Sequence, residues 1–481
     1  MKPLSLYAFV VIRTKYTFCA ENDSIIASYK NDSITLPNAT RNGYTFEGWY
    51  TSSSGGSLVG KAGATYTPTS SRTLYARWKK TITITYNANG GSNAPSSQTA
   101  TVYNDTTSYT FVLRTNKPTR TGYVFAGWAT SSTSTTVNWQ PGDTVEFNSS
   151  KTLYAVWAVA QMRLNGVINY YTTIQSAVDA ATNNTQMTVT LLINRTESFS
   201  VASNKKINLD LNSKTLQSEL TNYGTFKISN GTINLPSNMT VTDAAIVNYG
   251  IMEIVSGTYR TNKDGWFIVN KESANMTIES GTFVGTFKSD GVVIGNEGNL
   301  IINGGTITST HYGIVTANTK EKIPLSIIKN ANITGSPSVQ SGNVTGNYEQ
   351  LYGKTEITSS ILNGKVLSSG DSSYIILYYC TVPEETLNAE YGVIARVTKD
   401  TEGYDIYIYG VPISNEVRLP TWTTSGGQDD LQWYISTYSN NSWHYRVNIS
   451  NHKNQTGEYN TDVYKQVNGD SVFILSLLIN I

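Results

Sequence analysis

The sequence has 481 residues, more than a single hydrophobic core usually organises, so we expect two to four domains. Its 35 Lys and Arg nearly balance its 34 Asp and Glu and form no basic cluster, which argues against nucleic acid as a partner because counterion release needs a basic surface. The abundance of Ser, Thr, Asn, Gly and Tyr suits short strands and polar turns, so we expect an all-β fold.

Neither the ends of the chain nor its cysteines identify a compartment. Residues 1–15 are predicted to be a leader or a truncated start, since residues 3–12 are similar to a short signal peptide. No stretch reaches the roughly 20 apolar residues of a membrane span, and residues 472–481 are only half that length. Cys19 and Cys380 lie far apart, so we expect two free thiols and no disulfide.

Two sequence elements recur in the first third of the chain. Gly-Tyr-Thr-Phe-Glu-Gly-Trp at 43–49 recurs as Gly-Tyr-Val-Phe-Ala-Gly-Trp at 122–128, and Thr-Leu-Tyr-Ala-Arg-Trp at 73–78 recurs as Thr-Leu-Tyr-Ala-Val-Trp at 152–157, both at an offset of 79 residues. In the second element apolar and polar residues alternate, which predicts a half-buried strand. We interpret the aromatic side chains as the core of a small module.

Through these two elements, residues 16–79 and 80–158 resemble the Listeria-Bacteroides repeat of the internalin B-repeat type. The resemblance implies two small β-grasp-like domains in tandem, used as a stalk or spacer in bacterial surface and secreted proteins. The first copy departs from the pattern in its opening strand, where residues 16–23 replace the Tyr-Asn-Ala-Asn-Gly-Gly found at 86–91.

A shorter repeat follows, marked by Gly-Thr pairs that begin 26, 24 and 24 residues apart. Apolar residues recur five and three positions before each pair and two positions after it. Because strand side chains alternate, such columns mean that the same inward positions are filled in successive turns. We therefore predict a right-handed parallel β-helix over residues 160–400, with eight or nine coils between about 185 and 385. The pairs begin at Gly231, Gly257, Gly281 and Gly305.

A second column ends in Asn248, Asn270 and Asn296, and this pattern is typical of Asn side chains stacked at a corner of the coils. Beyond the last Gly-Thr pair the pattern weakens, and Leu325, Ile327 and Ile333 mark a looser coil.

One stretch, residues 173–181, is predicted to be helical because four apolar residues share one face. Such a helix can cover the open end of the stack. Together with Leu-Asp-Leu-Asn-Ser-Lys-Thr-Leu at 209–216, this entry resembles the start of pectate-lyase-like β-helix domains. The four apolar residues are Ile174, Ala177, Val178 and Ala181.

The last region, residues 403–481, has several short alternating strands separated by Gly and Asn turns, which favours a β-sandwich. Residues 417–434, with Asn451, His452 and the Thr-Gly-Glu-Tyr at 456–459, resemble the group B streptococcal Bsp-like repeat. The resemblance implies an accessory module of Gram-positive surface proteins and of some cell-wall hydrolases. Asp462 stands where that family usually has His, which weakens any inference from a shared site.

Acidic residues of the β-helix are candidates for catalysis, because β-helices host polysaccharide lyases and hydrolases. Lyases need an acid cluster for Ca²⁺ together with a Lys or Arg base, and hydrolases need paired carboxylates. Asp264 and Asp290 lie 26 residues apart, about one coil, with Lys263 and Lys288 nearby. Acids on solvated loops are usually ordinary surface residues. We therefore assign no catalytic residue, and with no metal-ligand spacing or phosphate loop we expect no metal and no cofactor.

The last region offers a candidate ligand-binding set of tryptophan, acidic, amide and imidazole side chains that could line a carbohydrate cleft. The alternative, which alternating aromatics in a small sandwich favour, is that the rings form the core and the adjacent acids shape a turn. The candidate residues are Trp422, Gln428, Asp429, Asp430, Trp433, Trp443 and His452.

These observations together predict a non-catalytic, extracellular surface or secreted protein, an adhesin-like display scaffold that binds host glycan, matrix protein or cell wall and is monomeric. The alternative function is a β-helix polysaccharide lyase or hydrolase with accessory repeats. A narrower hypothesis makes the Bsp-like module alone a cell-wall ligand.

Overall fold

The computed structural model describes residues 24–27, 33–69, 72–103, 106–235, 244–319, 322–342, 351–370, 372–390 and 392–481. Strands make up 57% and helix 4%, which confirms the expected all-β class. The predicted leader at 1–15, Cys19 and the departing strand at 16–23 lie outside the described residues. Within the described part, no helix is both long enough and apolar enough to cross a bilayer.

The chain forms two compact units, residues 1–121 with 125–157 and residues 122–124 with 158–481. In the first unit one long strand, β6 (Arg72–Asn87), contains the 73–78 element and continues into the following repeat. It pairs antiparallel with β3 (Thr45–Tyr50) and β7 (Gln98–Tyr103) and parallel with β11 (Lys151–Ala158). One strand therefore belongs to the sheet pairing of both repeats.

The predicted alternation of the recurring element is confirmed in β6. Leu74, Ala76 and Trp78 of β6 are buried, whereas in β11 the residue between Ala155 and Trp157, Val156, is buried as well. The described residues of this unit contain strands and no helix, and the β-grasp-like fold of the repeats stays a prediction. Its remaining strands are β1 (Ser24–Ala27), β2 (Ile34–Thr35), β4 (Leu58–Gly60), β5 (Thr65–Tyr66), β8 (Tyr109–Val112), β9 (Val124–Ala129) and β10 (Thr144–Phe147).

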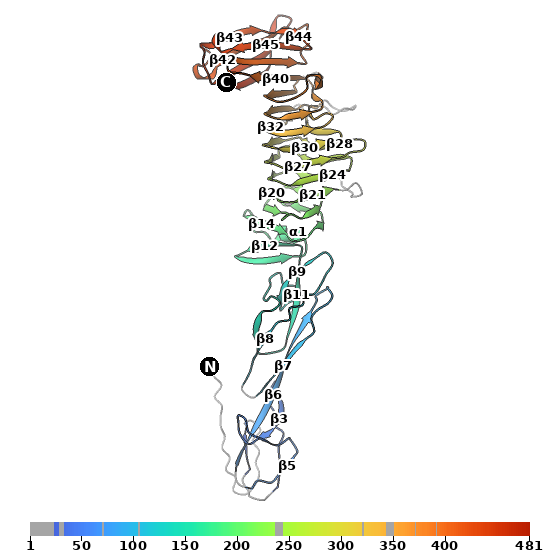
Figure 1. Ribbon diagram of the computed structural model, residues 1–481, viewed down its shortest axis with the longest axis vertical. Helices are drawn as coiled ribbons and strands as arrows, with labels where there is room; N and C mark the ends of the chain where they lie inside the picture. Colours follow the sequence, from blue (N-terminus) through green and yellow to red (C-terminus); the bar gives the residue numbers. More distant parts are fainter. Residues whose placement is uncertain are drawn as a thin grey trace. The chain divides into compact units, whose positions relative to one another are not determined.

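The second unit contains a parallel β-solenoid of about eight turns, built from three sheets whose strands stack coil upon coil (Figure 1). The solenoid part of the first sheet contains β14 (Gln186–Leu191), β17 (Lys206–Asp210), β20 (Thr225–Ser229), β23 (Ile251–Ile254), β26 (Asn275–Ile278), β29 (Asn299–Ile302), β32 (Leu325–Lys329), β35 (Lys354–Thr358), β38 (Tyr374–Tyr378) and β40 (Val393–Lys399). The second contains β15 (Arg195–Thr196), β18 (Thr215–Gln217), β21 (Thr232–Leu235), β24 (Thr258–Thr261), β27 (Thr282–Gly285), β30 (Gly305–Ser309), β33 (Ala331–Thr334) and β36 (Ile361–Asn363). The third contains β16 (Phe199–Val201), β19 (Leu220–Asn222), β22 (Ala244–Asn248), β25 (Gly265–Asn270), β28 (Gly291–Asn296), β31 (Tyr312–Thr316), β34 (Val339–Ser341), β37 (Val366–Ser369) and β39 (Leu387–Glu390).

The apolar columns expected from the Gly-Thr spacing are confirmed as register partners in adjacent coils. Phe226, Met252, Met276 and Leu300 form one buried column, and Ile233, Tyr259, Phe283 and Ile307 form another. The rings of Tyr259 and Phe283 stack with centroids 4.8 Å apart. Gly281 has a φ of +142°, and a Cβ there would lie 3.2 Å from the carbonyl oxygen of Gly257, so both backbone angle and space favour glycine at this bend.

The expected Asn ladder is also confirmed and is longer than predicted. Each buried Asn side-chain amide donates to the side-chain oxygen of the next, from Asn222 to Asn248 at 2.8 Å, to Asn270 at 2.8 Å and to Asn296 at 2.9 Å. Asn296 then donates to the hydroxyl of Ser326 at 3.0 Å. The ladder thus satisfies polar groups at a corner that is closed to solvent.

Of the three residues that mark the coil after Gly305, Ile333 is buried in register with Ile307, whereas Leu325 and Ile327 are only half-buried. The register pairs Leu300 with Ser326 and Ile302 with Ile328, so Ser326 and Ile328 are the buried positions of that coil. Ser326 faces inward because it continues the ladder of polar side chains, which outweighs the apolar pattern on the other side of the strand.

The first turn of the solenoid is covered as expected by α1 (Ile174–Ala180), whose residues Ile174, Ala177 and Val178 are buried in the solenoid core. Thr173 begins the helix, and its hydroxyl accepts a hydrogen bond from the Ser176 amide at 3.0 Å. The hairpin of β12 (Ala160–Leu164) and β13 (Val167–Tyr171) extends the first sheet at this end.

The C-terminal region packs two sheets around a common core, in agreement with the predicted sandwich, but one of these sheets is the solenoid's own. After β40 the first sheet continues antiparallel through β41 (Gly403–Tyr409), β45 (Ser442–Asn448) and β44 (Thr437–Ser439). The opposing sheet has the order β43 (Gln432–Ile435), β42 (Val417–Thr423), β46 (Glu458–Val467) and β47 (Asp470–Asn480).

Strands at the junction serve two cores at once. On β38, Ile375 and Leu377 are buried in the solenoid, whereas Ile376 is buried in the sandwich. On β40, Ile394 faces the solenoid while Ala395 lies in the sandwich core. Because successive side chains of a strand point to opposite faces, one sheet can close the solenoid on one side and carry the sandwich on the other.

Candidate functional site

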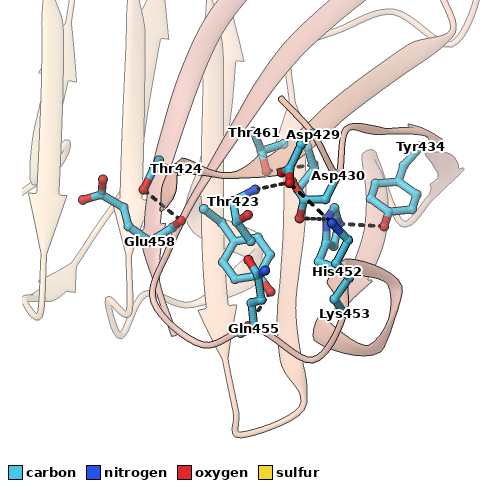
Figure 2. Close-up of polar contacts among 12 residues, drawn as sticks. Thr423, Thr424, Asp429, Asp430, Tyr434, His452, Lys453, Gln455, Glu458 and Thr461 are labelled. Carbon is cyan, nitrogen blue, oxygen red and sulfur yellow. Dashed lines mark hydrogen bonds and ion pairs between the residues drawn. The ribbon is translucent and has the colours of Figure 1, made fainter. Parts of the chain in front are cut away.

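The polar side chains of the predicted ligand-binding set meet between two loops of the sandwich. The first loop follows β42 and contains η3 (Thr424–Gly426), and the second contains η4 (Ile449–His452) between β45 and β46. Figure 2 shows Asp430 from the first loop pointing at His452 of the second, with Tyr434 of β43 on the other side of the imidazole.

These three residues form a buried hydrogen-bonded chain. The Asp430 carboxylate lies 3.0 Å from His452 Nδ1, and the Tyr434 hydroxyl lies 2.9 Å from His452 Nε2. A carboxylate can only accept, so Nδ1 carries a proton, and a neutral ring then accepts from the tyrosine at Nε2. The other Asp430 oxygen accepts the backbone amide of Thr423 at 3.0 Å.

The surroundings support this assignment of protons. Burial acts to raise the pKa of Asp430, but the hydrogen bonds from Thr423 and His452 outweigh it, and the pKa of this carboxyl lies below its usual value. Burial raises the pKa of Tyr434 to about 12, so its hydroxyl keeps its proton at neutral pH. The chain therefore consists of an ionised acid, an imidazole and a hydroxyl donor.

A carboxylate, imidazole and hydroxyl in this order are also the parts of a general-base relay. Here, however, His452 is 0% exposed and both of its ring nitrogens are engaged within the protein. Tyr434 is 8% exposed. The arrangement leaves no reactive atom in reach of a substrate, and its effect is to tie the two loops together.

The loop surface above this chain is polar and exposed. The Asp429 carboxylate forms an ion pair with the Lys453 ammonium across the two loops, with 3.4 Å between oxygen and nitrogen. The Thr424 hydroxyl donates to the Glu458 backbone carbonyl at 3.2 Å (Figure 2). Gln428 is exposed on the same loop. A Cβ on Gly426 would lie 2.4 Å from an oxygen of the exposed Asp429 side chain, which would have to move aside.

The three tryptophans of the predicted set do not join this cluster. Trp443 is buried in the sandwich core, where its indole N–H donates to the Val411 carbonyl at 3.0 Å. Trp433 is 54% exposed on the opposite side of its strand from Tyr434, and Trp422 is half-buried and alternates with the buried Thr421 and Thr423. The structure thus divides the set among core, buried chain and surface and does not bring all seven side chains together.

Sequence reasoning missed two groups of residues. Tyr434 was not proposed, although it follows Trp433 directly, and alternation along a strand places adjacent aromatics on opposite faces. Tyr464 and Phe473 lie beside Trp433, with centroids 5.9 Å apart for Trp433 and Tyr464 and 5.6 Å for Tyr464 and Phe473. Their neighbourhood depends on the order of strands in the sheet, for which the sequence carries no signal.

Of the two candidates for catalysis in the solenoid, Asp264 is engaged in local structure through its carboxylate and Asp290 through its backbone. The Asp264 carboxylate accepts the backbone amide of Lys288 at 2.6 Å and the Ser289 hydroxyl at 2.7 Å. These bonds, the Ser289 hydroxyl first, lower the pKa of Asp264. The Asp290 backbone carbonyl accepts the Gly265 amide at 3.0 Å. Among the described residues no group of His, Cys, Asp and Glu has the arrangement of a metal site.

Comparison with protein families agrees with the resemblances noted from the sequence. The model of the Listeria-Bacteroides repeat domain matches residues 15–77 and 83–156, and the model of the GBS Bsp-like repeat matches residues 393–476. The second match begins at β40, the strand that the solenoid and the sandwich share. No solved structure matches the chain. Repeat domains of bacterial surface type around a β-solenoid fit the scaffold of a surface protein.

Proposed function

We propose that this protein is a bacterial extracellular surface protein that displays its C-terminal module on a rigid solenoid and binds a host or cell-wall polysaccharide or a matrix protein without catalysis. The two N-terminal repeats act as a spacer, as in the surface proteins that carry such repeats. The protein is proposed to work as a monomer.

The observation that carries this proposal is the continuity of the first sheet. Strand pairing runs without interruption from β13 through every coil to β44, so the module has no flexible linker to the solenoid. The junction strands contribute Ile376 and Ala395 to the module's core. A terminal module held in this way keeps a fixed orientation on its support, which suits presentation of a binding surface.

The alternative, a polysaccharide lyase or hydrolase, has less support. Its best acid, Asp264, accepts hydrogen bonds from the loop of the next coil and has a lowered pKa, whereas a general acid needs a raised one. In the sandwich, the buried His452 has no open position.

The full chain can test both hypotheses in one experiment. Incubated with purified peptidoglycan, a panel of polysaccharides and immobilised matrix protein, it is expected to be retained on at least one surface and to release no reducing ends or unsaturated sugars. An Asp264→Ala variant serves as the control and should bind like the wild type. The proposal would be contradicted by product formation that this variant or Asp290→Ala abolishes. It would also be contradicted if a reagent that cannot enter intact cells left the protein unlabelled.

A further inference from the structure

We infer that the outer face of the β43-β42-β46-β47 sheet is a binding surface for an uncharged polysaccharide; this rests on the proposed display function and names its ligand class. The surface, called here the outer aromatic face, is defined by side chains that alternate with the buried ones of the same strands. They include Arg418, Trp422, Trp433, Asp462, Tyr464 and Phe473, together with the exposed aliphatic side chains of Ile435 and Leu478.

The register brings aromatic rings from three strands into one cluster. Tyr464 of β46 pairs with Arg418 of β42 on one side and with Phe473 of β47 on the other. Trp433 of β43 contacts the Tyr464 ring across the sheet. Trp433 is 54% and Phe473 is 53% exposed, although rings of this size are normally covered. An exposed aromatic cluster of this kind marks a surface that contacts a partner.

Hydrogen-bonding side chains lie beside these rings. Asp462 lies two residues from Tyr464, and its carboxylate accepts the Asn460 amide at 3.3 Å and the Ser476 hydroxyl. Outward positions on one strand recur about every 7 Å, so the Asp462 carboxylate and the Tyr464 ring are separated by roughly that step. A sugar chain presents the matching features, apolar C–H faces and hydroxyls, whereas a protein hot spot has its aromatic anchors at the centre of a dry patch.

The charges of the face decide between neutral and charged polymers. Its cation, Arg418, already forms an ion pair with Glu416 at 2.6 Å. The carboxylates of Asp462 and, at the far end of β46, Glu458 also lie on this side, while Lys465 alternates to the other side from Tyr464. An anionic polymer would need unpaired Arg or Lys in forked or clustered arrangement, and this face offers instead carboxylates that accept sugar hydroxyls.

The two central strands of this sheet leave no opening for a peptide strand. The backbone groups of β42 and β46 pair with neighbours on both sides, and β-strand addition requires a free edge, which in this sheet lies at the outermost strands β43 and β47. A ligand that lies over β42 and β46 must therefore contact side chains, as a stacked and hydrogen-bonded sugar does.

The test measures binding of the full chain to soluble neutral glucan, galactomannan and mannan and to anionic hyaluronan and polygalacturonate, by titration calorimetry and by Trp fluorescence. We expect binding to at least one neutral polymer. Trp433→Ala should weaken that binding at least tenfold, and Tyr464→Ala and Phe473→Ala should each weaken it several-fold. Ile413→Ala, which removes an apolar side chain that is 69% exposed elsewhere in the module, should leave it unchanged.

Thermal unfolding and far-ultraviolet circular dichroism of each variant establish that the sheet is intact, and Trp433→Tyr, which keeps a ring, should restore most of the affinity. Equal affinity of Trp433→Ala and wild type, or binding confined to the anionic polymers, would overturn the inference. So would self-association of the wild type that Trp433→Ala abolishes. In each case the display function stands if the full chain is on the cell surface and binds another polymer or a matrix protein.

Discussion

Two extended chains of hydrogen-bonded polar side chains lie in the interior of this protein, one in the candidate site of the sandwich and one in the solenoid. The Asp430, His452 and Tyr434 chain joins two loops of the sandwich, and the Asn ladder joins successive coils. In both, a buried donor meets a buried acceptor, so removal of one member leaves its partner unsatisfied at a cost larger than the net value of the bond itself.

The first prediction concerns His452. Replacement of His452 by Ala leaves the Asp430 carboxylate and the Tyr434 hydroxyl buried without their partner, and we expect the free energy of unfolding to fall by about 3 kcal/mol. Urea denaturation of the full chain, followed by Trp fluorescence, measures this change. Lys453→Ala, on the adjacent exposed residue, should change stability by no more than about 0.5 kcal/mol. Equal effects of the two variants would refute the structural role of the chain.

The second prediction concerns Asn248, in the middle of the ladder. Its side chain bonds to Asn222 and Asn270 and to backbone groups of the corner, including the Gly250 amide at 3.1 Å. Asn248→Ala should therefore lower the free energy of unfolding by about 3 kcal/mol. The matched control is Asn275→Ala, since Asn275 forms an exposed pair with Asn299 at 3.1 Å and should contribute less than about 0.5 kcal/mol. Calorimetric unfolding compares the two, and a smaller loss for Asn248 than for Asn275 would contradict the prediction.

Among the elements, the strands of the junction explain how the module is attached. The run from Tyr374 to Tyr378 is apolar or aromatic at every position, which is typical of a strand covered on both faces. Its two sides belong to different cores, so the module begins inside the solenoid and before the change of pattern near residue 403. This continuity affects any experiment on the isolated module.

The third prediction follows from that junction. A fragment of residues 400–481 lacks β38 and β40 and with them Ile376, Ala395 and Val397 of the module's core, so we expect it to be unfolded. A fragment of residues 158–481 retains every strand of the second unit and should fold. Proton–nitrogen correlation spectra distinguish the two cases. Dispersed amide signals from the shorter fragment would mean that its core is self-sufficient.

Elements with a strong local period were predictable from the sequence. The Gly-Thr step located the stacked strands, and the spacing of Ile174, Ala177 and Val178 located the helix. The apolar pattern gave no sign of Ser326, whose inward position is set by the polar ladder of the neighbouring coils. The two-residue period of a strand indicates which side chains share a face. Which of the two faces points inward depends on partner strands that are far away in the sequence.

The candidate site was predictable only in part for the same reason. The sequence singled out Asp430 and His452, which the structure brings together, but it also included Trp443, which lies in the core. Strand order decides which aromatic residues become neighbours, and it brings Trp433 of β43 beside Tyr464 of β46 across the intervening strand β42.

At the scale of the whole molecule, the second unit joins the solenoid and the proposed binding module through one sheet. The first unit has a sheet of its own, in which β6 pairs with strands of both repeats. Display by a scaffold requires that the module keep its orientation on the solenoid, and this requirement can be measured without knowledge of the ligand.

The most direct measurement is a distance distribution between two spin labels in the fragment 158–481, one at Thr308→Cys on the exposed side of β30 and one at Ser439→Cys at the exposed end of β44. The native Cys380 is buried, and burial raises the pKa of its thiol to about 11, so labelling is directed to the introduced residues. Pulsed electron paramagnetic resonance should give a single narrow distance, because the solenoid and the module share a sheet. A broad or two-peaked distribution would show a flexible joint and contradict the rigid display of the module.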